Sequence, residues 1–350
     1  MKILKKYILP AALVAGFLFY FFSDAFCRHF SLDDYFYEGL VRRFGISGSI
    51  KAIYDTANGR WFSHIICAYS FKFIGTGFIT YGIYLTTLLI LFLFSAGTFY
   101  DVYNATFLKR KISFVEQSWF SLVFAACIYF LLFAGRWETW GWVASANTHL
   151  MSVIVSLLLF SFLMKNEARA SSAVWVFFLS AFLGGLNEIN AICAALTAVG
   201  VLFITKKYFP DIKLNDTNMV ITVITIIGSL LINMNSGGYK ERMAGLPDFK
   251  VMQSAKNTLH SFVMPVLHYQ TLLYFLAALI IFILFVSEGK PHFSKRHFIV
   301  GSFSLAIVAL SFFGHCFTLS DVVPARGAIW GYCFLLLILT FVLIPKKTEE

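Results

Sequence analysis

Long apolar runs follow one another along the chain and are separated by short polar segments. About ten of these runs have the roughly 17 to 25 residues that a transmembrane helix needs. They lie near residues 7 to 23, 74 to 99, 114 to 134, 147 to 164, 171 to 187, 188 to 205, 217 to 234, 264 to 286, 297 to 315 and 326 to 344. The pattern predicts an all-α polytopic transmembrane bundle in which residues 1 to 350 form a single transmembrane domain.

The run from residue 173 to residue 204 is nearly unbroken and is too long for one crossing. At about 1.5 Å per residue it would make a helix about 50 Å long, whereas the hydrocarbon core is about 30 Å thick. We therefore expect two helices with a turn at residues 184 to 188, where two glycines permit a bend and the only charge of the run occurs.

The composition supports a membrane protein. Hydrophobic residues make up 59% of the chain and charged residues only 13%, which excludes a soluble domain. The net charge of +10 comes from Lys and Arg dispersed among short loops, so we expect it to set topology and expect no nucleic-acid partner. The six cysteines show no metal-binding spacing, and we assign them no role beyond that of small buried residues.

Short basic segments alternate with longer segments that carry acids and tryptophans. The basic ones are the N-terminal lysines, which precede an uncleaved first helix, and residues 109 to 111, 165 to 169, 206 to 213, 290 to 296 and 346 to 347. Under the positive-inside rule both termini are cytoplasmic. The outer segments are then 24 to 73, 135 to 146, the turn at 187 and 188, 235 to 261 and 316 to 325, and the first of these is expected to hold juxtamembrane amphipathic helices.

The first outer segment contains the adjacent carboxylates Asp33 and Asp34 close to the membrane surface. Adjacent carboxylates repel, so one tends to hold its proton or bind a cation, and either state suits a general base or a ligand for Mg²⁺ or Mn²⁺. The alternative is that Ser31 or Asp33 caps an amphipathic surface helix over residues 34 to 44. Taken alone, the pattern favours the cap.

Further candidate binding residues lie later in the first outer segment and in or beside three of the others. Arg60 follows the Asn58-Gly59 turn and could hold a phosphate, or it could be a snorkelling arginine with an aromatic anchor. In the second segment, Trp137, Glu138 and Trp140, followed by Asn147 and His149, resemble a sugar platform, although taken alone the pattern favours an interfacial aromatic belt. Lys240, Arg242 and Arg326 could bind phosphate, the first two beside a glycine turn, or could be solvated loop residues.

Glu188 is an acid inside otherwise apolar sequence, which favours a functional role; the alternative is a turn residue at the aqueous boundary. With Asp33 and Asp34 it gives three carboxylates on one face, and we expect them to meet in one cavity. Acids, arginines and aromatics converge on this face through five separate segments, which favours a site there over a purely structural arrangement.

The arrangement resembles the GT-C superfamily of multi-pass membrane glycosyltransferases, and most of all bacterial O-antigen glucosyltransferase-like proteins and their relatives. The resemblance rests on the first helix, on Asp33-Asp34-Tyr35 in a long first outer segment, and on the run from Asn58 to Ser63. The architecture covers nearly the whole chain, whereas the motifs cover short segments only. Larger members carry a soluble C-terminal domain that has no counterpart after the last apolar run here.

The resemblance implies a bacterial inner-membrane enzyme with its active site on the periplasmic or extracellular side. It would move a sugar, with inversion, from a polyprenyl-phosphate donor to a glycan or glycolipid acceptor of the cell envelope. Asp33 or Asp34 would deprotonate the acceptor, and replacing either by Asn is expected to leave the fold intact. Arginines would neutralise the departing phosphate, and Tyr35 and Asn58 would contact sugar or acceptor.

Two other functions remain open from the sequence. A transporter or flippase for a lipid-linked or anionic envelope precursor should place ionisable groups near the middle of its helices and show repeated halves. The charges here gather near the helix ends and no repeat is visible, which favours the enzyme. A non-enzymatic assembly subunit is the third possibility.

Overall fold

The computed structural model describes residues 7–27, 31–75, 77–165, 169–210, 212, 214–244, 251–267, 269–287, 295–319 and 324–343. These residues form helices and connecting segments, and no strand occurs among them. The predicted all-α class is therefore confirmed. The predicted basic segments at 165 to 169, 206 to 213 and 290 to 296 lie partly outside the described residues, and both basic termini lie wholly outside them.

The first half of the chain forms the elements α1 (Leu9–Cys27), α2 (Leu32–Thr56), α3 (Trp61–Ile74), α4 (Phe78–Tyr103), η2 (Asn104–Leu108), α5 (Phe114–Leu131), η3 (Phe133–Gly135), η4 (Trp137–Gly141), α6 (Val143–Ser145), η5 (Ala146–Leu150) and α7 (Met151–Met164). The second half forms α8 (Ala170–Leu186), α9 (Glu188–Tyr208), α10 (Asp216–Met234), α11 (Gly237–Ala244), α12 (Val251–Leu267), α13 (Tyr269–Val286), α14 (Lys295–Leu319) and α15 (Ala325–Leu343).

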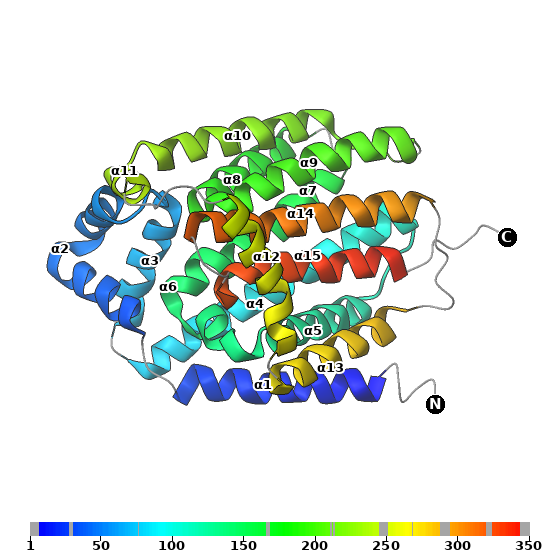
Figure 1. Ribbon diagram of the computed structural model, residues 1–350, viewed down its shortest axis with the longest axis horizontal. Helices are drawn as coiled ribbons and strands as arrows, with labels where there is room; N and C mark the ends of the chain where they lie inside the picture. The colour runs from blue at the N-terminus through cyan, green and yellow to red at the C-terminus, as the bar shows by residue number, and fades with distance from the viewer. Residues whose placement is uncertain are drawn as a thin grey trace.

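Most of the long helices run in roughly the same direction or its reverse, side by side, as a bundle (Figure 1). The helices α2, α3 and α11 gather at one end of this bundle, on the left of Figure 1, and we call this the α2–α3 end. At the opposite end α1 begins and α15 finishes. The helix α12 departs from the common direction and crosses the others steeply.

Within the described residues, 7 helices are long and apolar enough to cross a membrane. Three shorter apolar helices, at Ala170–Leu186, Leu272–Val286 and Arg326–Thr340, lie among them. The long apolar run also breaks where the sequence predicted it, because Asn187 is extended between α8 and α9. The chain is therefore a multi-pass membrane protein built of apolar helices.

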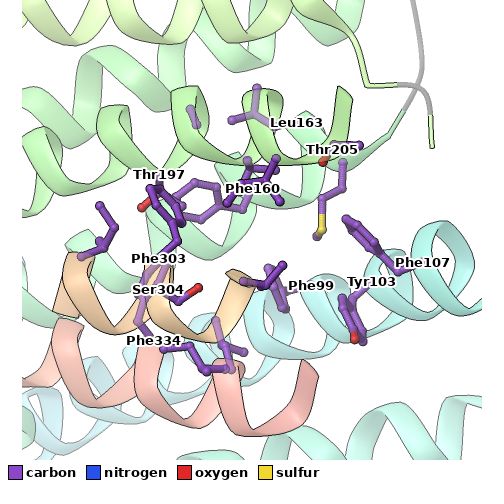
Figure 2. Close-up of a pocket in the computed structure, with 18 of the residues that line it drawn as sticks. Phe99, Tyr103, Phe107, Phe160, Leu163, Thr197, Thr205, Phe303, Ser304 and Phe334 are labelled. Carbon is purple, nitrogen blue, oxygen red and sulfur yellow. The ribbon is translucent and has the colours of Figure 1, made fainter. Parts of the chain in front are cut away.

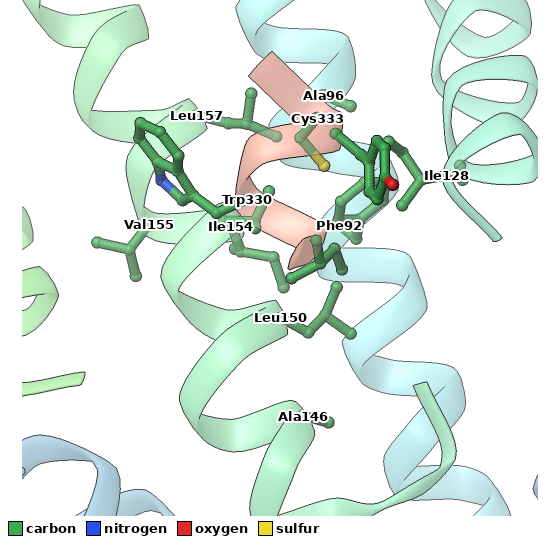
Figure 3. Packing of buried hydrophobic residues seen from close by; sticks show 14 of the residues in the cluster. Phe92, Ala96, Ile128, Ala146, Leu150, Ile154, Val155, Leu157, Trp330 and Cys333 are labelled. Atoms are coloured by element: carbon green, nitrogen blue, oxygen red, sulfur yellow. The ribbon is translucent and has the colours of Figure 1, made fainter. Parts of the chain in front are cut away.

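Buried side chains of α4, α5, α7 and α15 make the centre of the bundle (Figure 3). Trp330 of α15 is fully buried there, with its ring stacked on Phe334 at a centroid separation of 3.8 Å. Its indole N–H donates to the Ser156 hydroxyl of α7 at 3.1 Å. A polar atom that would otherwise be orphaned in the apolar interior is thereby satisfied, and α15 is fixed against α7.

Several predicted outer loops are helical. Residues 24 to 73 hold α2 and α3, and α2 bends at Gly45, whose φ of 68° belongs to the left-handed region. The segment 135 to 146 is a chain of short helical turns that continues into α7, and residues 235 to 261 contain α11 and most of α12. These sequences are too polar or too short to be recognised as transmembrane helices. Their helices pack against the bundle instead.

Candidate functional site

Asp34 fixes the beginning of α2 at the α2–α3 end. Ser31 is the N-cap in a capping box: its hydroxyl accepts from the backbone N–H of Asp34, while Oδ2 of Asp34 accepts from the backbone N–H of Ser31 at 3.1 Å. The other oxygen, Oδ1, accepts from the backbone N–H of Ala144 at 2.9 Å. Of the two caps that the sequence allowed, Ser31 is thus the one observed, and Asp34 ties α2 to α6.

The two adjacent carboxylates have opposite environments. Asp34 has no exposed surface, and its burial raises the pKa of the carboxyl to about 6, although the backbone hydrogen bonds from Ala144 and Ser31 act in the other direction. Asp33 is exposed, and so is Tyr35. One acid is therefore engaged in the packing of α2, while its neighbour is open to a reactant.

Arg60 and Glu188 form an ion pair between the start of α3 and the start of α9. The Arg60 Nε donates to Oε2 of Glu188 at 2.9 Å, and the two side chains are 18% and 16% exposed. Oδ1 of Asn58 accepts from the backbone N–H of Arg60 at 3.1 Å, which shapes the turn between α2 and α3. Two candidate residues that are 128 positions apart in the chain are thereby brought into contact.

His64 joins this turn to α2. Its Nε2 lies 2.9 Å from the carbonyl oxygen of Asn58, and its Nδ1 lies 3.3 Å from the Tyr37 hydroxyl. Burial lowers the pKa of His64 to about 4, so the imidazole is neutral near pH 7. A carbonyl can only accept, so Nε2 carries the proton and Nδ1 accepts from Tyr37. Burial also raises the pKa of the Tyr37 hydroxyl, which keeps it a donor.

The acidic groups lie within electrostatic range of the pair of Tyr37 and His64. The charges of Asp33 and Asp34 act on Tyr37, and the charge of Glu188 acts on His64. The three predicted carboxylates are thus in the same region of the bundle. They are not directly joined by any hydrogen bond described above, because Asp34 bonds backbone amides and Glu188 bonds Arg60.

His149 lies deeper, in η5, and is buried. Its Nδ1 is 3.4 Å from the amide nitrogen of Asn187, and its ring centroid is 6.1 Å from that of His315 on α14. The charges of Arg60 and Arg326 both act on its ring. Groups from the turn before α3, the break before α9, α14 and α15 therefore lie around this histidine, and Arg60 and Arg326 give this surrounding a positive charge.

Arg326 is at the start of α15, where its guanidinium carbon lies 4.7 Å from the ring centroid of Trp142. This cation–π contact holds the arginine at the α2–α3 end of the bundle. A planar guanidinium in such a position can still offer donors to an oxyanion. Arg60 and Arg326 are therefore the two candidate phosphate-binding residues that the fold brings to the same histidine.

Asn147 is buried and committed to helix packing. Its Oδ1 accepts from the Tyr84 hydroxyl, and its Nδ2 donates to the Ser70 hydroxyl at 3.3 Å and lies 3.6 Å from the Cys67 sulfur. The amide therefore joins η5 to α3 and α4. Within this arrangement its polar atoms are occupied by the protein and not presented at a surface.

Trp140 of the second outer segment differs from the expected platform or belt. Trp140 is only 2% exposed and packs against the rings of Phe92 and Phe17, at centroid distances of 5.2 and 6.2 Å. A sugar needs an exposed ring face, and Trp140 offers none. Trp137 and Glu138 are half-buried in η4. The expectation failed for Trp140 because the segment folds inward as helical turns rather than spreading along the membrane surface.

The glycine pair before Lys240 serves close packing. A Cβ on Gly237 would lie 2.5 Å from the carbonyl oxygen of Asp55, and one on Gly238 would lie 2.5 Å from the backbone nitrogen of Ala57. These glycines begin α11 and let it pack on the end of α2, so the expected anion-binding turn is a helix start. Lys240 is exposed on α11.

The side chain of one further candidate, Arg242, lies outside the described part. Among the side chains that are described, no group of three or more His, Cys, Asp or Glu could hold a metal ion. The expectation of a divalent cation at the acid pair therefore stays a prediction.

Tyr37, His64 and His315 are not among the candidate residues that the sequence predicts. A signal was present for His315, since an imidazole inside an apolar run is unusual enough to mark a candidate. His64 and Tyr37 gave no comparable signal, because their pairing depends on how α2 folds back over α3.

Comparison of the chain with protein-family models, curated proteins and solved structures finds no match.

Proposed function

We propose that the chain is a GT-C-type membrane glycosyltransferase. It crosses the bacterial inner membrane about ten times, with both termini in the cytoplasm and the α2–α3 end outside. It takes a sugar from a polyprenyl-phosphate donor and transfers it, with inversion, to a glycan or glycolipid of the cell envelope, such as O-antigen. The 7 long and three shorter apolar helices support this number of crossings.

One observation carries the proposal: acids, arginines and histidines from separate elements converge at one end of an otherwise apolar bundle. Asp33 comes from α2, Arg60 from the turn before α3, Glu188 from α9 and Arg326 from α15. Lipid-facing helices gain nothing from such groups, which are costly to remove from water. A reaction between a lipid-linked phosphosugar and a hydroxyl requires this set: a base and cations at the membrane boundary.

The geometry favours a division of roles. Asp33, the exposed acid, is the general base that accepts the acceptor's proton, and Asp34 positions it by fixing the first turn of α2. Arg60 and Arg326 bind the donor phosphate and stabilise the charge that develops on it as the glycosidic bond breaks. Glu188 orients Arg60 through the 2.9 Å bond to Nε, which leaves the terminal nitrogens for phosphate.

Transport of a lipid-linked precursor is less well supported by the described helices. Their candidate spans carry Asp, Glu, Lys and Arg only near the ends, as with Asp24, Asp101, Glu116, Glu188 and Asp216. Carriers that move ions or charged substrates place such groups near the bilayer midplane. The enzyme therefore accounts better for the distribution of charge.

The experiment is transfer of radiolabelled glucose from polyprenyl phosphate to endogenous envelope acceptors, in membranes that contain each variant at equal abundance. Asp33→Asn should lower transfer by about 10² to 10⁴-fold, the usual effect of losing a general base. Arg60→Ala should weaken use of the donor. Asp55→Asn is the matched control, because Asp55 is an exposed acid at the far end of α2.

The control variant should transfer as wild type does. Full activity in both Asp33→Asn and Arg60→Ala would contradict the proposal, and transport would then be the better explanation. If no variant including wild type transfers glucose, the same panel is repeated with polyprenyl-phosphate mannose and galactose. Absence of transfer from all three donors would also count against the enzyme.

A further inference from the structure

A second feature of the molecule lies at the opposite end from the polar site. A partly open cavity of about 150 Å³ lies between α4, α7, α9, α14 and α15 (Figure 2). Its wall is formed mainly by aromatic and aliphatic side chains, including Phe99, Phe160, Phe303 and Phe334. The polar network around Arg60 and Glu188 contributes nothing to its lining.

The cavity requires few hydrogen bonds from an occupant. The Thr197 hydroxyl donates to the carbonyl of Cys193 at 2.7 Å, and the Thr340 hydroxyl donates to the carbonyl of Leu336 at 2.9 Å. These hydroxyls are thus satisfied within their own helices. An apolar cavity of about this size stays dry and takes up hydrocarbon.

The cavity is also placed where a lipid chain can enter. Most of the spanning surface of α9 and α14 is not buried within the protein, since only 33% and 28% of their spanning residues are buried. Both helices therefore lie at the edge of the bundle and face lipid. Because the cavity is partly open and these helices present apolar surface, a hydrocarbon chain from the bilayer can reach it without leaving an apolar environment.

Cations follow the lining residues at three helix ends. Lys165 comes directly after Met164, Lys206 and Lys207 directly after Thr205, and Lys109 two positions after Phe107; Met164, Thr205 and Phe107 all line the cavity. Lys206 is engaged with Asp216, while Lys165 and Lys207 lie over aromatic rings at 5.8 and 5.5 Å. The rim at this end is thus positively charged and suits an anionic headgroup.

We propose that this cavity binds one acyl chain of an anionic phospholipid from the leaflet at the end where α1 begins. The phosphate of that lipid lies among Lys109, Lys165 and Lys207, and its chain fills the space beside Phe303. A polyprenyl phosphate engaged at Arg60 would have its phosphate at the other end of the bundle and would leave these lysines without a headgroup. The site is therefore separate from the proposed transferase site and does not depend on it.

The first test fills the cavity. Val201 of α9 lines it, whereas Val199 lies two residues away on the same helix and is 47% exposed on the outer surface. Wild type and Val199→Phe, purified in mild detergent, should retain one phosphatidylglycerol per chain by native mass spectrometry. Val201→Phe should bind added phosphatidylglycerol about tenfold or more weakly, the loss expected when about two buried methylene groups are excluded.

A second variant, Ser304→Phe, fills the same space from α14. It distinguishes the loss of the cavity from misfolding of Val201→Phe. Each variant is checked for an unchanged elution volume before lipid is added. Retention of phosphatidylglycerol by both cavity variants at the level of Val199→Phe would overturn the proposal.

The second test examines the headgroup. Phosphatidylglycerol should raise the Tm of wild type more than phosphatidylcholine does, and the double variant Lys165→Gln, Lys207→Gln should reduce that difference. Lys51→Gln, Lys72→Gln is the matched control, since these exposed lysines lie on α2 and α3. Equal binding of both phospholipids by wild type, or retention of polyprenyl phosphate in place of phospholipid, would exclude the anionic phospholipid as the occupant.

Discussion

At the level of single residues, Asp34 decides how the first outer segment is attached to the bundle. Asp34→Ala removes the acceptor for the backbone N–H groups of Ser31 and Ala144. Leaving such groups unpaired, together with loss of the cap, should lower the free energy of unfolding by about 2 kcal/mol. Asp33→Ala is the control, because the exposed Asp33 should change stability by less than about 0.5 kcal/mol. Thermal and denaturant unfolding in detergent measure both.

The same contacts revise one expectation from the sequence. Replacing Asp34 by Asn was expected to preserve the fold, but an amide has a single acceptor oxygen, whereas the carboxylate accepts two backbone N–H groups. Asp34→Asn would turn an NH₂ toward one of these donors. A loss of transfer in that variant would therefore not identify a base, and Asp33→Asn is the informative substitution.

Asp34 and His64 should make stability depend on pH in opposite directions. The folded-state pKa of Asp34 is raised to about 6, so its contribution to stability falls as pH rises from about 4 to about 6. The folded-state pKa of His64 is lowered to about 4, so its contribution is lost as pH falls from about 6.5 to about 4. Each effect is at most about 3 kcal/mol.

Single substitutions separate the two effects. On acidification from pH 6.5 to 4, Asp34→Ala should lose stability more steeply than wild type, and His64→Gln less steeply. Unfolding midpoints measured at each pH check this. Parallel pH curves for the two variants would show that neither group titrates between these limits.

The candidate site shows what the sequence can predict at this scale. Asp33, Arg60 and Glu188 could be selected because charges beside or inside apolar runs are unusual. The partners of Asp34 could be predicted only in part: Ser31 is three residues away, whereas Ala144 is 110 positions away and contributes a backbone amide that leaves no trace in the sequence. Long-range pairing between side chain and main chain has no compositional signature.

At the level of elements, two glycines determine how α2 is shaped and docked. Gly45 has φ 68° and ψ −176°, a conformation that is essentially restricted to glycine, and it divides α2 into two parts. Gly45→Ala should therefore lower the free energy of unfolding by about 1 to 3 kcal/mol. Gly39→Ala in the same helix is the control, because a Cβ there meets nothing within 4 Å and Ala favours helix. An unchanged Tm in Gly45→Ala would mean that α2 can straighten at no cost.

Gly59 tests the docking of the α2–α3 turn on α10. A Cβ at Gly59 would lie 2.0 Å from the carbonyl oxygen of Asn233, and backbone atoms cannot move aside as a flexible side chain would. Gly59→Ala should thus displace the turn, cost about 1 to 3 kcal/mol and disturb the Arg60 and Glu188 pair. Unfolding of Gly59→Ala beside Gly228→Ala, a site with open space, provides the comparison.

The elements were predictable where one physical requirement dominated. A helix that crosses lipid must be apolar over about 20 residues, so the spanning helices could be recognised from hydropathy alone. The helices α2, α11 and α12 and the turns from η3 to η5 obey no such single rule. They are held by caps, glycine contacts and buried polar pairs with distant elements, and only part of α2 could be anticipated, from Ser31 and the acids after it.

At the scale of the whole molecule, the bundle has two chemically different ends. The candidate acids Asp33, Asp34 and Glu188 and the arginines Arg60 and Arg326 lie at the α2–α3 end, whereas the lysines that follow Phe107, Met164 and Thr205 lie at the end where α1 begins. The first set suits work on a phosphosugar, and the second suits anchoring in an anionic leaflet. Because α1 begins and α15 finishes at the lysine-bearing end, a single orientation in the membrane satisfies both sets of charges.

That orientation is the last prediction. Asp55 lies near the end of α2, and Lys111 lies between η2 and α5 at the opposite end; both are exposed and accept a cysteine without loss of packing. Cys67, Cys127, Cys193, Cys316 and Cys333 are buried, so a background that carries Cys27→Ser should react little with maleimide. In intact cells a membrane-impermeant maleimide should label Asp55→Cys at once and Lys111→Cys only after permeabilisation, because short basic loops stay in the cytoplasm while long segments can be exported largely regardless of their charge. Labelling of Lys111→Cys in intact cells would invert the protein and place the α2–α3 end in the cytoplasm. The donor would then have to be presented on the cytoplasmic face, and the proposed reaction with an outer envelope acceptor would fail.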